Sequence, residues 1–401
     1  MKRNGLRLLG LLLALALILG GCTPGRTVTP PEERPTERDY AREYGDRWCY
    51  RCLTPRMQQM YAALYRAVKE YRTDTWVTIR EGNTGTEYVG LKVKLPTPLT
   101  DSEEARLLFT AFTADNPQFF YIGNTYSYEG YRQGGVDRYD VFCLTLTMDA
   151  RSRDLAAAEL ERAVAGILAQ TADCADEYRR ELRIHDLLAA RITYDAATAE
   201  GDPAEQRANA FTAYGALVEG SAVCEGYSRA MQLLMNRLGI RCTLVSGSAP
   251  EGGSHMWNLL EIDGRGYHLD LTWDDGDDRL HHTFFNLTTE EILLSHRIDG
   301  DNVGVDTCVS TGANYYRREG LYLTTYDREE IASAVAARIK AGAETVDLRF
   351  SEETFANAQL FFSSSRRLTQ YVERFLEGEK MWRYTCQANE TYHTLTLYKE
   401  N

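Results

Sequence analysis

Three residues in the middle of the chain carry side chains that can act together on a carbonyl group. Cys224, His255 and Asp270 follow one another in that order. A cysteine thiolate is a strong nucleophile, but a free thiol needs activation at neutral pH. A histidine can take the thiol proton, and a carboxylate can orient the imidazole and stabilise its protonated form. The three residue types therefore suit thiol-dependent acyl chemistry, provided that the fold brings them together.

A helix is expected to start near Cys224. From Tyr227 to Leu238 the apolar residues recur at three- and four-residue steps, which is the helical period, and Gly239 is a suitable stop. Ser221 is a candidate N-cap, which would put Cys224 in the first turn. Unpaired backbone N–H groups and the positive end of the helix dipole favour a thiolate at that position.

A β-hairpin is expected to carry the other two side chains. Residues 256–262 and 267–272 have the composition of two strands joined by an Asp-Gly-Arg-Gly turn. With a two- or four-residue loop, paired residue numbers sum to an odd value, so His255 and Asp270 point to the same face. A one-residue shift in register would separate them. The hairpin therefore allows Asp270 to hold His255, and His255 to activate Cys224.

Each of these residues also has an ordinary structural explanation. A buried cysteine, a hydrogen-bonded core histidine and an aspartate beside a turn are all common in globular proteins. Taken singly, each structural explanation is the better one. Taken together, with the helix start and the hairpin, the three residues favour an active site.

The sequence around the three residues resembles the core motifs of the transglutaminase-like superfamily. The motifs are Cys224-Glu-Gly-Tyr-Ser, Ser254-His-Met-Trp-Asn258 and Tyr267-His-Leu-Asp-Leu-Thr-Trp-Asp274, and the segment Thr212-Ala-Tyr-Gly-Ala-Leu217 resembles bacterial members. The resemblance covers residues 175–300 and implies a papain-like fold with a Cys-His-Asp triad at Cys224, His255 and Asp270. The family includes protein cross-linkers, peptidases, amidases and inactive binding proteins. It therefore implies thiol acyl chemistry without a particular substrate.

Three further residues are candidates for supporting roles. The oxyanion of the reaction would rest on the backbone N–H of Cys224 and on one upstream polar side chain, for which Tyr214 is the candidate. Trp257 and Trp273 would wall the site, although core packing explains both equally well.

Neither a cofactor nor a metal is expected. The acidic segment 273–278 lacks the ligand spacing of an EF-hand and is expected to be a solvated turn. His281 and His282 lack cysteine or carboxylate partners at zinc spacing. His185 lies on the apolar side of its expected helix, which favours a core histidine over a second base.

The start of the chain has the features of a bacterial lipoprotein signal. Three basic residues precede an apolar run that is too short for an ordinary membrane span. The run ends in Leu19-Gly-Gly-Cys22, which resembles a lipobox; in that family cleavage precedes the cysteine, which then carries lipid. An ordinary secretory signal is the alternative. We therefore expect a signal peptide over residues 1–21 and a protein anchored outside the cytoplasm, on the bacterial cell membrane, by lipid on Cys22.

Composition narrows the class of partner. The chain has 401 residues, a formal net charge of −13 and nine cysteines. Nucleic-acid binding needs clustered Lys and Arg, so no nucleic acid is expected. The cysteines without an assigned role cannot all pair internally, and Cys49 and Cys52 are expected to be free thiols or a local bridge.

An α+β fold is expected, in which a papain-like core is flanked by two small α+β domains. Residues 22–40, rich in Pro, Thr, Glu and Arg, are expected to be a disordered tether. We expect an N-terminal domain over residues 41–150, a catalytic domain over residues 151–305 and a C-terminal domain over residues 306–401. The function expected is that of a cysteine peptidase or amidase, or a transglutaminase-type acyltransferase, acting on a peptide or protein in the cell envelope. The alternative is a catalytically silent cell-surface binding protein built on the same scaffold.

Overall fold

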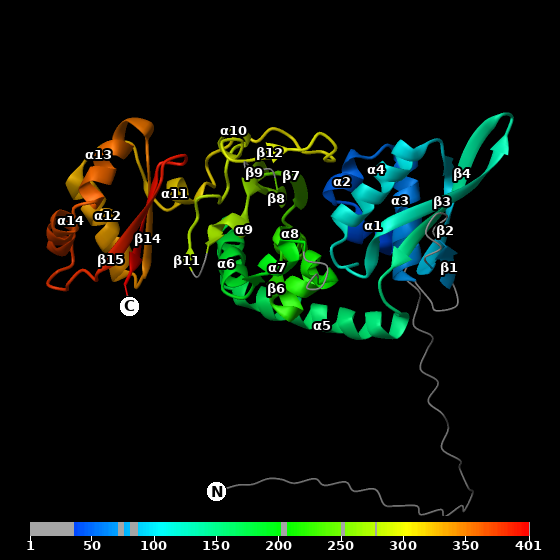
Figure 1. Cartoon of the computed structure of the whole chain (residues 1–401), viewed down its shortest axis with the longest axis horizontal. Helices are drawn as coiled ribbons and strands as arrows, with labels where there is room; N and C mark the ends of the chain where they lie inside the picture. The colour runs from blue at the N-terminus through cyan, green and yellow to red at the C-terminus, as the bar shows by residue number, and fades with distance from the viewer. Residues whose placement is uncertain are drawn as a thin grey trace, which may run out of the picture. The chain divides into compact units, whose positions relative to one another are not determined.

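Three four-stranded β-sheets, each with its own helices, organise the protein in a computed structural model (Figure 1). The structure describes residues 36–70, 76–80, 87–201, 207–249, 253–276 and 279–400, and contacts group residues 37–401 into one compact unit. The predicted signal peptide and the predicted lipid site at Cys22 lie outside the described residues. Among the described residues, helices long and apolar enough to cross a membrane do not occur.

The N-terminal region is an antiparallel sheet with helices, in strand order β1-β2-β4-β3. Thr54 and Asp101 cap two of its helices through their side chains. The predicted tether is four residues too long, because a helix begins at Glu37 and buries Tyr40 against Tyr65. The elements are α1 (Glu37–Tyr44), α2 (Trp48–Cys52), α3 (Pro55–Lys69), β1 (Trp76–Arg80), β2 (Glu87–Leu99), α4 (Ser102–Asp115), β3 (Ile122–Gln133) and β4 (Val136–Leu146).

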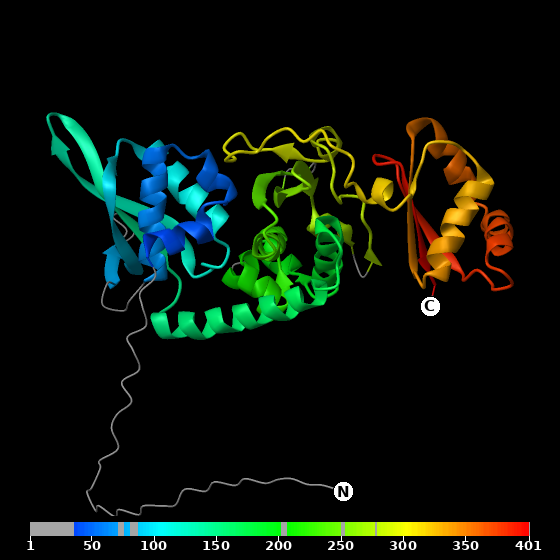
Figure 2. The ribbon, with the colours of Figure 1, turned by 180° about the vertical axis from the view of Figure 1, so that it is seen from behind.

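The core region begins with helices and short turns that surround one central helix, α8 (Cys224–Arg237). The long helix α5 lies against the turn η4 and against α6 (Figure 2). The elements that precede α8 are α5 (Ala150–Leu168), η2 (Ala169–Thr171), α6 (Glu177–Ala189), β5 (Thr193–Tyr194), α7 (Ala196–Ala199), η3 (Ala208–Phe211), η4 (Gly215–Glu219) and β6 (Ser221–Ala222).

The second half of the core is an antiparallel sheet in the order β12-β7-β8-β9, built from β7 (Cys242–Ser248), β8 (Ser254–Ile262), β9 (Arg265–Leu269) and β12 (Arg297–Ile298). Asp263 and Gly264 both have positive φ, the conformation of the two-residue turn that best matches the twist of a hairpin. The predicted return strand is too long: it ends at Leu269, and α9 (Leu271–Asp274) follows at once. β10 (Asp275–Gly276), β11 (Arg279–Leu280) and α10 (Thr289–Ile292) complete the core.

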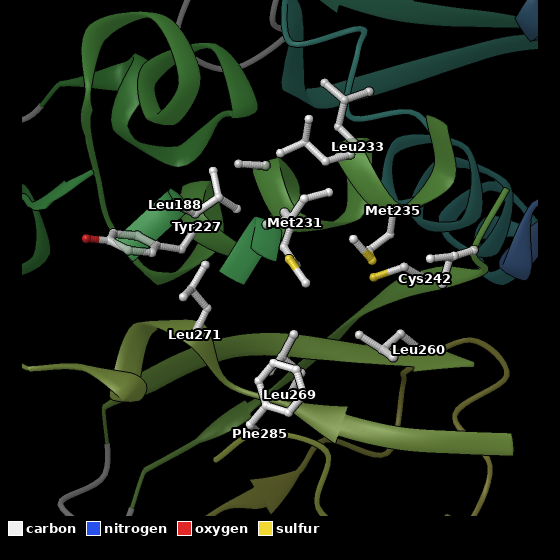
Figure 3. Packing of buried hydrophobic residues seen from close by; sticks show 14 of the residues in the cluster. Leu188, Tyr227, Met231, Leu233, Met235, Cys242, Leu260, Leu269, Leu271 and Phe285 are labelled. Atoms are coloured by element: carbon white, nitrogen blue, oxygen red, sulfur yellow. The ribbon is translucent and has the colours of Figure 1, made fainter. Parts of the chain in front are cut away.

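Helix α8 packs its apolar face on this sheet. Figure 3 shows Met231 and Met235 of α8 facing Leu260 of β8 and Leu269 of β9, and all four are fully buried. The three- and four-residue spacing that predicts the helix is therefore the spacing of its buried face.

The C-terminal region is a third sheet, in the order β13-β14-β16-β15, with helices. Its elements are α11 (Tyr315–Arg318), β13 (Tyr322–Leu323), α12 (Arg328–Lys340), β14 (Thr345–Phe350), α13 (Glu352–Phe362), α14 (Ser365–Val372), η5 (Glu373–Phe375), β15 (Tyr384–Asn389) and β16 (Thr394–Lys399). The mixture of helices and largely antiparallel sheets confirms the predicted α+β class.

Candidate active site

Cys224 is the first residue of α8, where the sequence predicts it. Its thiol is free and partly exposed. The N-cap residue is Val223, which makes no side-chain cap, so the prediction of Ser221 as N-cap is wrong. Ser221 instead lies in β6, paired with Thr193 of β5. The backbone N–H of Val223 donates to the carbonyl of Ala210 at 3.0 Å, and this bond holds the entry to the helix.

His255 and Asp270 lie on the same face of the hairpin, as predicted from its register. Asn258 pairs with Leu269, so paired residue numbers sum to an odd value. His255 Nε2 lies 2.7 Å from Asp270 Oδ2, and both side chains are buried. The thiol of Cys224 lies close enough to the His255 imidazole to raise the pKa of His255. Because Nε2 faces the carboxylate, Nδ1 is the ring nitrogen left for the thiol.

The electrostatics of this group favour a protonated imidazole. Burial alone lowers the pKa of His255, but the charge and hydrogen bond of Asp270, with a smaller effect from Cys224, raise it to about 10. Burial alone raises the pKa of Asp270, but His255 and His296 hold it well below its usual range. A carboxylate and an imidazolium therefore coexist in a buried site next to a thiol.

A second histidine, which the sequence analysis does not identify, binds the same carboxylate. His296 Nε2 lies 3.0 Å from Asp270 Oδ2, the oxygen that also binds His255. The other oxygen of Asp270 accepts hydrogen bonds from the backbone N–H groups of Thr272 and Trp273, at 3.0 and 3.2 Å, where it caps α9. The side chain of Asp270 therefore has four hydrogen-bond partners.

His296 in turn is connected to the C-terminal region. Its Nδ1 lies 2.8 Å from Ser295 Oγ, which lies 2.6 Å from the hydroxyl of Tyr392. Tyr392 is buried and lies in the turn between β15 and β16. Nothing in the local sequence around Ser295 and His296 indicates this role, because the partner is supplied by a segment far along the chain.

The structure does not support Tyr214 as an oxyanion donor. Its hydroxyl donates to Glu159 Oε2 of α5 at 2.6 Å, and its ring stacks on Phe120. A different tyrosine, Tyr194 of β5, lies within electrostatic range of Cys224: burial, then the charges of Cys224 and Asp270, raise its pKa. β5 pairs with β6, the strand just before α8, which explains how Tyr194 reaches the site.

The rings of Trp257 and Trp273 both lie close to His255 and His296. The ring of Trp257 lies 6.0 Å from that of His255 and is fully buried, and its Nε1 donates to His268 Nδ1 at 3.1 Å. The ring of Trp273 lies 5.6 Å from that of His255 and 4.4 Å from that of His296. Trp257 is thus a core residue behind the imidazole, and Trp273 is the partly exposed ring beside it.

A second network of histidines and carboxylates lies in the core region. His185 Nδ1 lies 3.0 Å from Asp186 Oδ1, and its Nε2 lies 3.2 Å from Asp274 Oδ2. Asp186 Oδ1 also lies 3.0 Å from His282 Nε2. The prediction of a solvated acidic turn is wrong for Asp274, because that side chain is fully buried between His185 and His281.

Two groups of donor atoms in the described part of the chain are close enough to hold a metal ion, namely His185, Asp186 and His282, and His255, Asp270 and His296. In both groups a carboxylate oxygen lies within hydrogen-bond distance of two imidazole nitrogens. Hydrogen bonding accounts for both arrangements. His282 does have carboxylate and imidazole neighbours, which come from α6 rather than from its own sequence neighbourhood.

The described cysteines are unpaired. They are Cys49, Cys52, Cys143, Cys174, Cys224, Cys242, Cys308 and Cys386. Cys49 and Cys52 are thus two free thiols, one of the two alternatives that the sequence leaves open.

Comparison with known proteins finds one matching family model and several weakly similar solved structures. Residues 165–270 match the model of the Transglutaminase-like superfamily. Curated protein sequences give no match. Similar solved structures include a TGase (15% identity, TM-score 0.28, covering 51% of this chain and 57% of that one). They also include an inferred cysteine protease from Cytophaga hutchinsonii (13% identity, TM-score 0.24, covering 38% of this chain and 63% of that one). A third is an inferred protease from Parabacteroides distasonis (10% identity, TM-score 0.21, covering 37% of this chain and 36% of that one).

The chain spans less than two thirds of each of these three proteins, and similarity this weak does not bear on activity or substrate. The family match covers the thiol, the imidazole, the carboxylate and the helix and hairpin that carry them. Residues 165–270 therefore form a transglutaminase-like core, a fold that supports a thiol enzyme.

Proposed function

We propose that Cys224, His255 and Asp270 form a catalytic triad that acts on amide bonds of peptides or proteins through an acyl-enzyme. The observation that carries the proposal is the position of His255, whose Nε2 lies 2.7 Å from Asp270 and whose imidazole is close enough to Cys224 for the thiol to affect its pKa. A thiol, an imidazole and a carboxylate thus follow one another in the order that thiol acyl chemistry needs. The raised pKa of His255 keeps the imidazole protonated at neutral pH, the form that can give a proton to the leaving amine.

The reaction would proceed in two steps. The Cys224 thiolate attacks the amide carbonyl carbon, and the oxyanion formed is stabilised by the backbone N–H of Cys224 and the hydroxyl of Tyr194. The C–N bond breaks as His255 gives its proton to the leaving amine, which leaves a thioester. Water or an amine then attacks the thioester and passes its proton to His255. The C–S bond breaks, and the thiolate returns beside the imidazolium.

Hydrolysis and transfer share these steps and differ only in the second nucleophile. We favour hydrolysis, because an amine outcompetes water only where the acceptor site is dry, and the thiol here is partly exposed. Incubation with glutamine-containing peptides and a labelled amine separates the two. Incorporation of the amine that exceeds hydrolysis would assign the protein as an acyltransferase.

The chain offers matched controls for a test of the thiol. Cys52 and Cys386 are free cysteines in exposed positions, and desolvation of their thiols raises their pKa values, in the case of Cys386 to about 11. We expect iodoacetamide at neutral pH to label Cys224 much faster than either, and His255→Gln to abolish the difference. Equal labelling of the three thiols in the wild-type protein would refute the thiolate.

A catalytically silent binding protein is the second candidate. The observation in its favour is the pair of additional sheets in the N-terminal and C-terminal regions, which a minimal thiol enzyme does not need. Equal capture of a peptide ligand by the wild-type protein and Cys224→Ala, without turnover by the wild type, would favour this candidate.

We also propose that the protein is a lipoprotein that works in the bacterial cell envelope. The support is the sequence that ends in Leu19-Gly-Gly-Cys22. A thioether diacylglycerol has two acyl chains, which suffice for stable anchoring where one chain is marginal. Cys22→Ser should prevent uptake of radioactive palmitate in a bacterial host, and a wild-type protein that takes up none and stays soluble would rule out the anchor.

A further inference from the structure

Two buried polar side chains link the helix that carries the thiol to the strand that carries the imidazole. They are Ser228 of α8 and Asn258 of β8, and each is almost fully buried. Ser228 lies about one helical turn after Cys224, and Asn258 lies three residues after His255. Burying a polar group is costly unless the group is hydrogen-bonded, so the partners of these two side chains indicate their role.

The hydroxyl of Ser228 lies between the two main-chain segments that bear the reacting side chains. Its oxygen lies 2.9 Å from the carbonyl oxygen of Cys224 and 3.0 Å from that of Met256. Met256 directly follows His255. The hydroxyl has one proton, which the two carbonyl oxygens share. The bond to Cys224 is the usual one from a helical serine to the carbonyl one turn back, whereas the bond to Met256 crosses from the helix to the sheet.

Asn258 makes the reverse connection, from the sheet to the helix. Its side-chain nitrogen donates to the carbonyl of Ser228 at 3.0 Å and to the carbonyl of Thr243, in β7, at 3.2 Å. The sheet therefore bonds the helix at the same residue whose side chain bonds the sheet. We call Ser228 and Asn258 together the polar clamp.

The apolar contacts between α8 and the sheet define the position of the helix less sharply. Met231 and Met235 of the helix face Leu260 and Leu269 of the sheet (Figure 3), and methionine side chains are flexible enough to fill irregular gaps. Hydrogen bonds are more demanding, because they weaken beyond about 3.2 Å and because a buried carbonyl that loses its donor costs free energy. The polar clamp therefore limits how far α8 can shift against β8.

Thiol acyl chemistry depends on the separation of these two elements. α8 begins at Cys224, and His255 is the second residue of β8. A nucleophile and its base must lie within hydrogen-bond reach of each other, and a misplacement of about 1 Å can cost about a hundredfold in rate. A shift of the helix against the strand therefore changes the distance on which the reaction depends.

We propose that Ser228 and Asn258 are positioning residues, which set the distance between the thiol of Cys224 and the imidazole of His255. The proposal rests on the proposed function and adds two residues to the same site. Both side chains act through main-chain carbonyl groups of the helix and the strand. The polar clamp thus gives two buried side chains outside the triad a role in catalysis.

The first test measures turnover of peptides by variants of α8. Ser228→Ala removes the hydroxyl that crosses to β8 and should lower kcat by about tenfold to a hundredfold, with little change in KM. Asn258→Ala, which removes the reverse bond, should act in the same direction. Asn236→Ala is the matched control: Asn236 also bonds the sheet, donating to the carbonyl of Cys242 at 3.4 Å, but it lies near the other end of α8. This control should keep kcat close to the wild-type value even where it lowers the melting temperature.

Labelling of Cys224 by iodoacetamide separates failure of the clamp from failure of the proposed function, because it needs no substrate. We expect Ser228→Ala to slow labelling, and the double variant with His255→Gln to label as fast as His255→Gln alone, since the clamp acts through the imidazole. This pattern without any peptide turnover would support the clamp and reject the amide chemistry.

Two outcomes would overturn the clamp while the triad stands. One is that His255→Gln slows labelling and Ser228→Ala does not. The other is that the effects of the two substitutions add, as they would if Ser228 were purely structural. A His255→Gln variant that labels as fast as the wild type would overturn both the clamp and the triad.

Discussion

His296 Nε2 lies 3.0 Å from the same oxygen of Asp270 that holds His255. The carboxylate of a triad fixes the tautomer and the orientation of the imidazole. A group that holds the carboxylate in place therefore affects catalysis indirectly, through the imidazole. If Cys224, His255 and Asp270 form the proposed triad, His296 is a positioning residue that acts on His255 through Asp270.

Replacing His296 by Leu should lower kcat by roughly tenfold to a hundredfold, because a hydrogen bond to a charged group is worth about 1.5–3 kcal/mol. KM should change little, since the side chain is buried away from the substrate. The pH profile provides the specific readout: with one donor lost, the pKa of Asp270 rises and that of His255 shifts. His296→Gln keeps one side-chain N–H group and should recover part of the activity. If His296 were purely structural, its replacement would lower thermal stability but leave the pH profile of activity unchanged.

The pH dependence of activity follows from the raised pKa of His255. The imidazolium must protonate the leaving amine, and its pKa is about 10. We therefore expect kcat/KM to stay high through neutral pH and to fall as the pH approaches about 10, where His255 loses its proton. Asp270→Asn removes the charge that raises this pKa, so its alkaline limb should move to lower pH. An alkaline limb near the ordinary histidine pKa in the wild type would contradict the ion pair.

Tyr194 and Tyr214 form a matched pair for the oxyanion. Tyr194 lies within electrostatic range of Cys224, while the hydroxyl of Tyr214 is bonded to Glu159. Tyr194→Phe should lower kcat by about 10²–10³-fold, the usual cost of one oxyanion donor. Tyr214→Phe should leave kcat close to the wild-type value. The reverse pattern would restore Tyr214 as the donor.

The second histidine network predicts a loss of stability at alkaline pH. Burial lowers the pKa of His185, but hydrogen bonds and charges from Asp186 and Asp274 raise it to about 9, above the unfolded value of about 6.5. A raised folded pKa gives stability that is fully present below the unfolded pKa and is lost as the pH rises through about 9. Melting temperatures measured across this range should therefore decline.

Asp274→Ala should destabilise the fold by about 3–5 kcal/mol, because it removes one of the two carboxylates that bind the buried His185 and the carboxylate that pairs with His281. The same substitution should also make the melting temperature less dependent on pH in the alkaline range. Asp173→Asn, an exposed aspartate, is the control and should leave both the stability and its pH dependence unchanged. A small effect of Asp274→Ala, similar to that of the control, would show that the network contributes little.

Local signals account for what the sequence predicts correctly. The start of α8 at Cys224, its stop at Gly239 and the odd-sum register of the hairpin all follow from helical periodicity, a left-handed glycine and an Asp-Gly turn. These features bring Cys224, His255 and Asp270 together. Residues whose role depends on distant segments were not predictable: His296 needs Tyr392, and Tyr194 reaches the thiol only because β5 pairs with β6.

The same physics explains the errors. Tyr214 lies ten residues before the thiol in sequence, but its hydroxyl is bound by a helix that the local sequence does not reveal as its neighbour. Asp274 follows an apolar segment and precedes three more acidic residues, which is typical of a solvated turn. Instead, the side chain is buried and pairs with two histidines, the buried His185 of α6 and the partly buried His281.

The bond between Ser295 and Tyr392 also sets an order of events during synthesis. Tyr392 is translated more than a hundred residues after Asp270, so a ribosome-bound chain carries the thiol, the imidazole and the carboxylate before their last support exists. A nascent chain would then hold a weakly positioned triad, which limits premature attack on neighbouring proteins. For the same reason, Tyr392→Phe, which removes the hydroxyl that binds Ser295, should affect the site less than replacement of His296 itself.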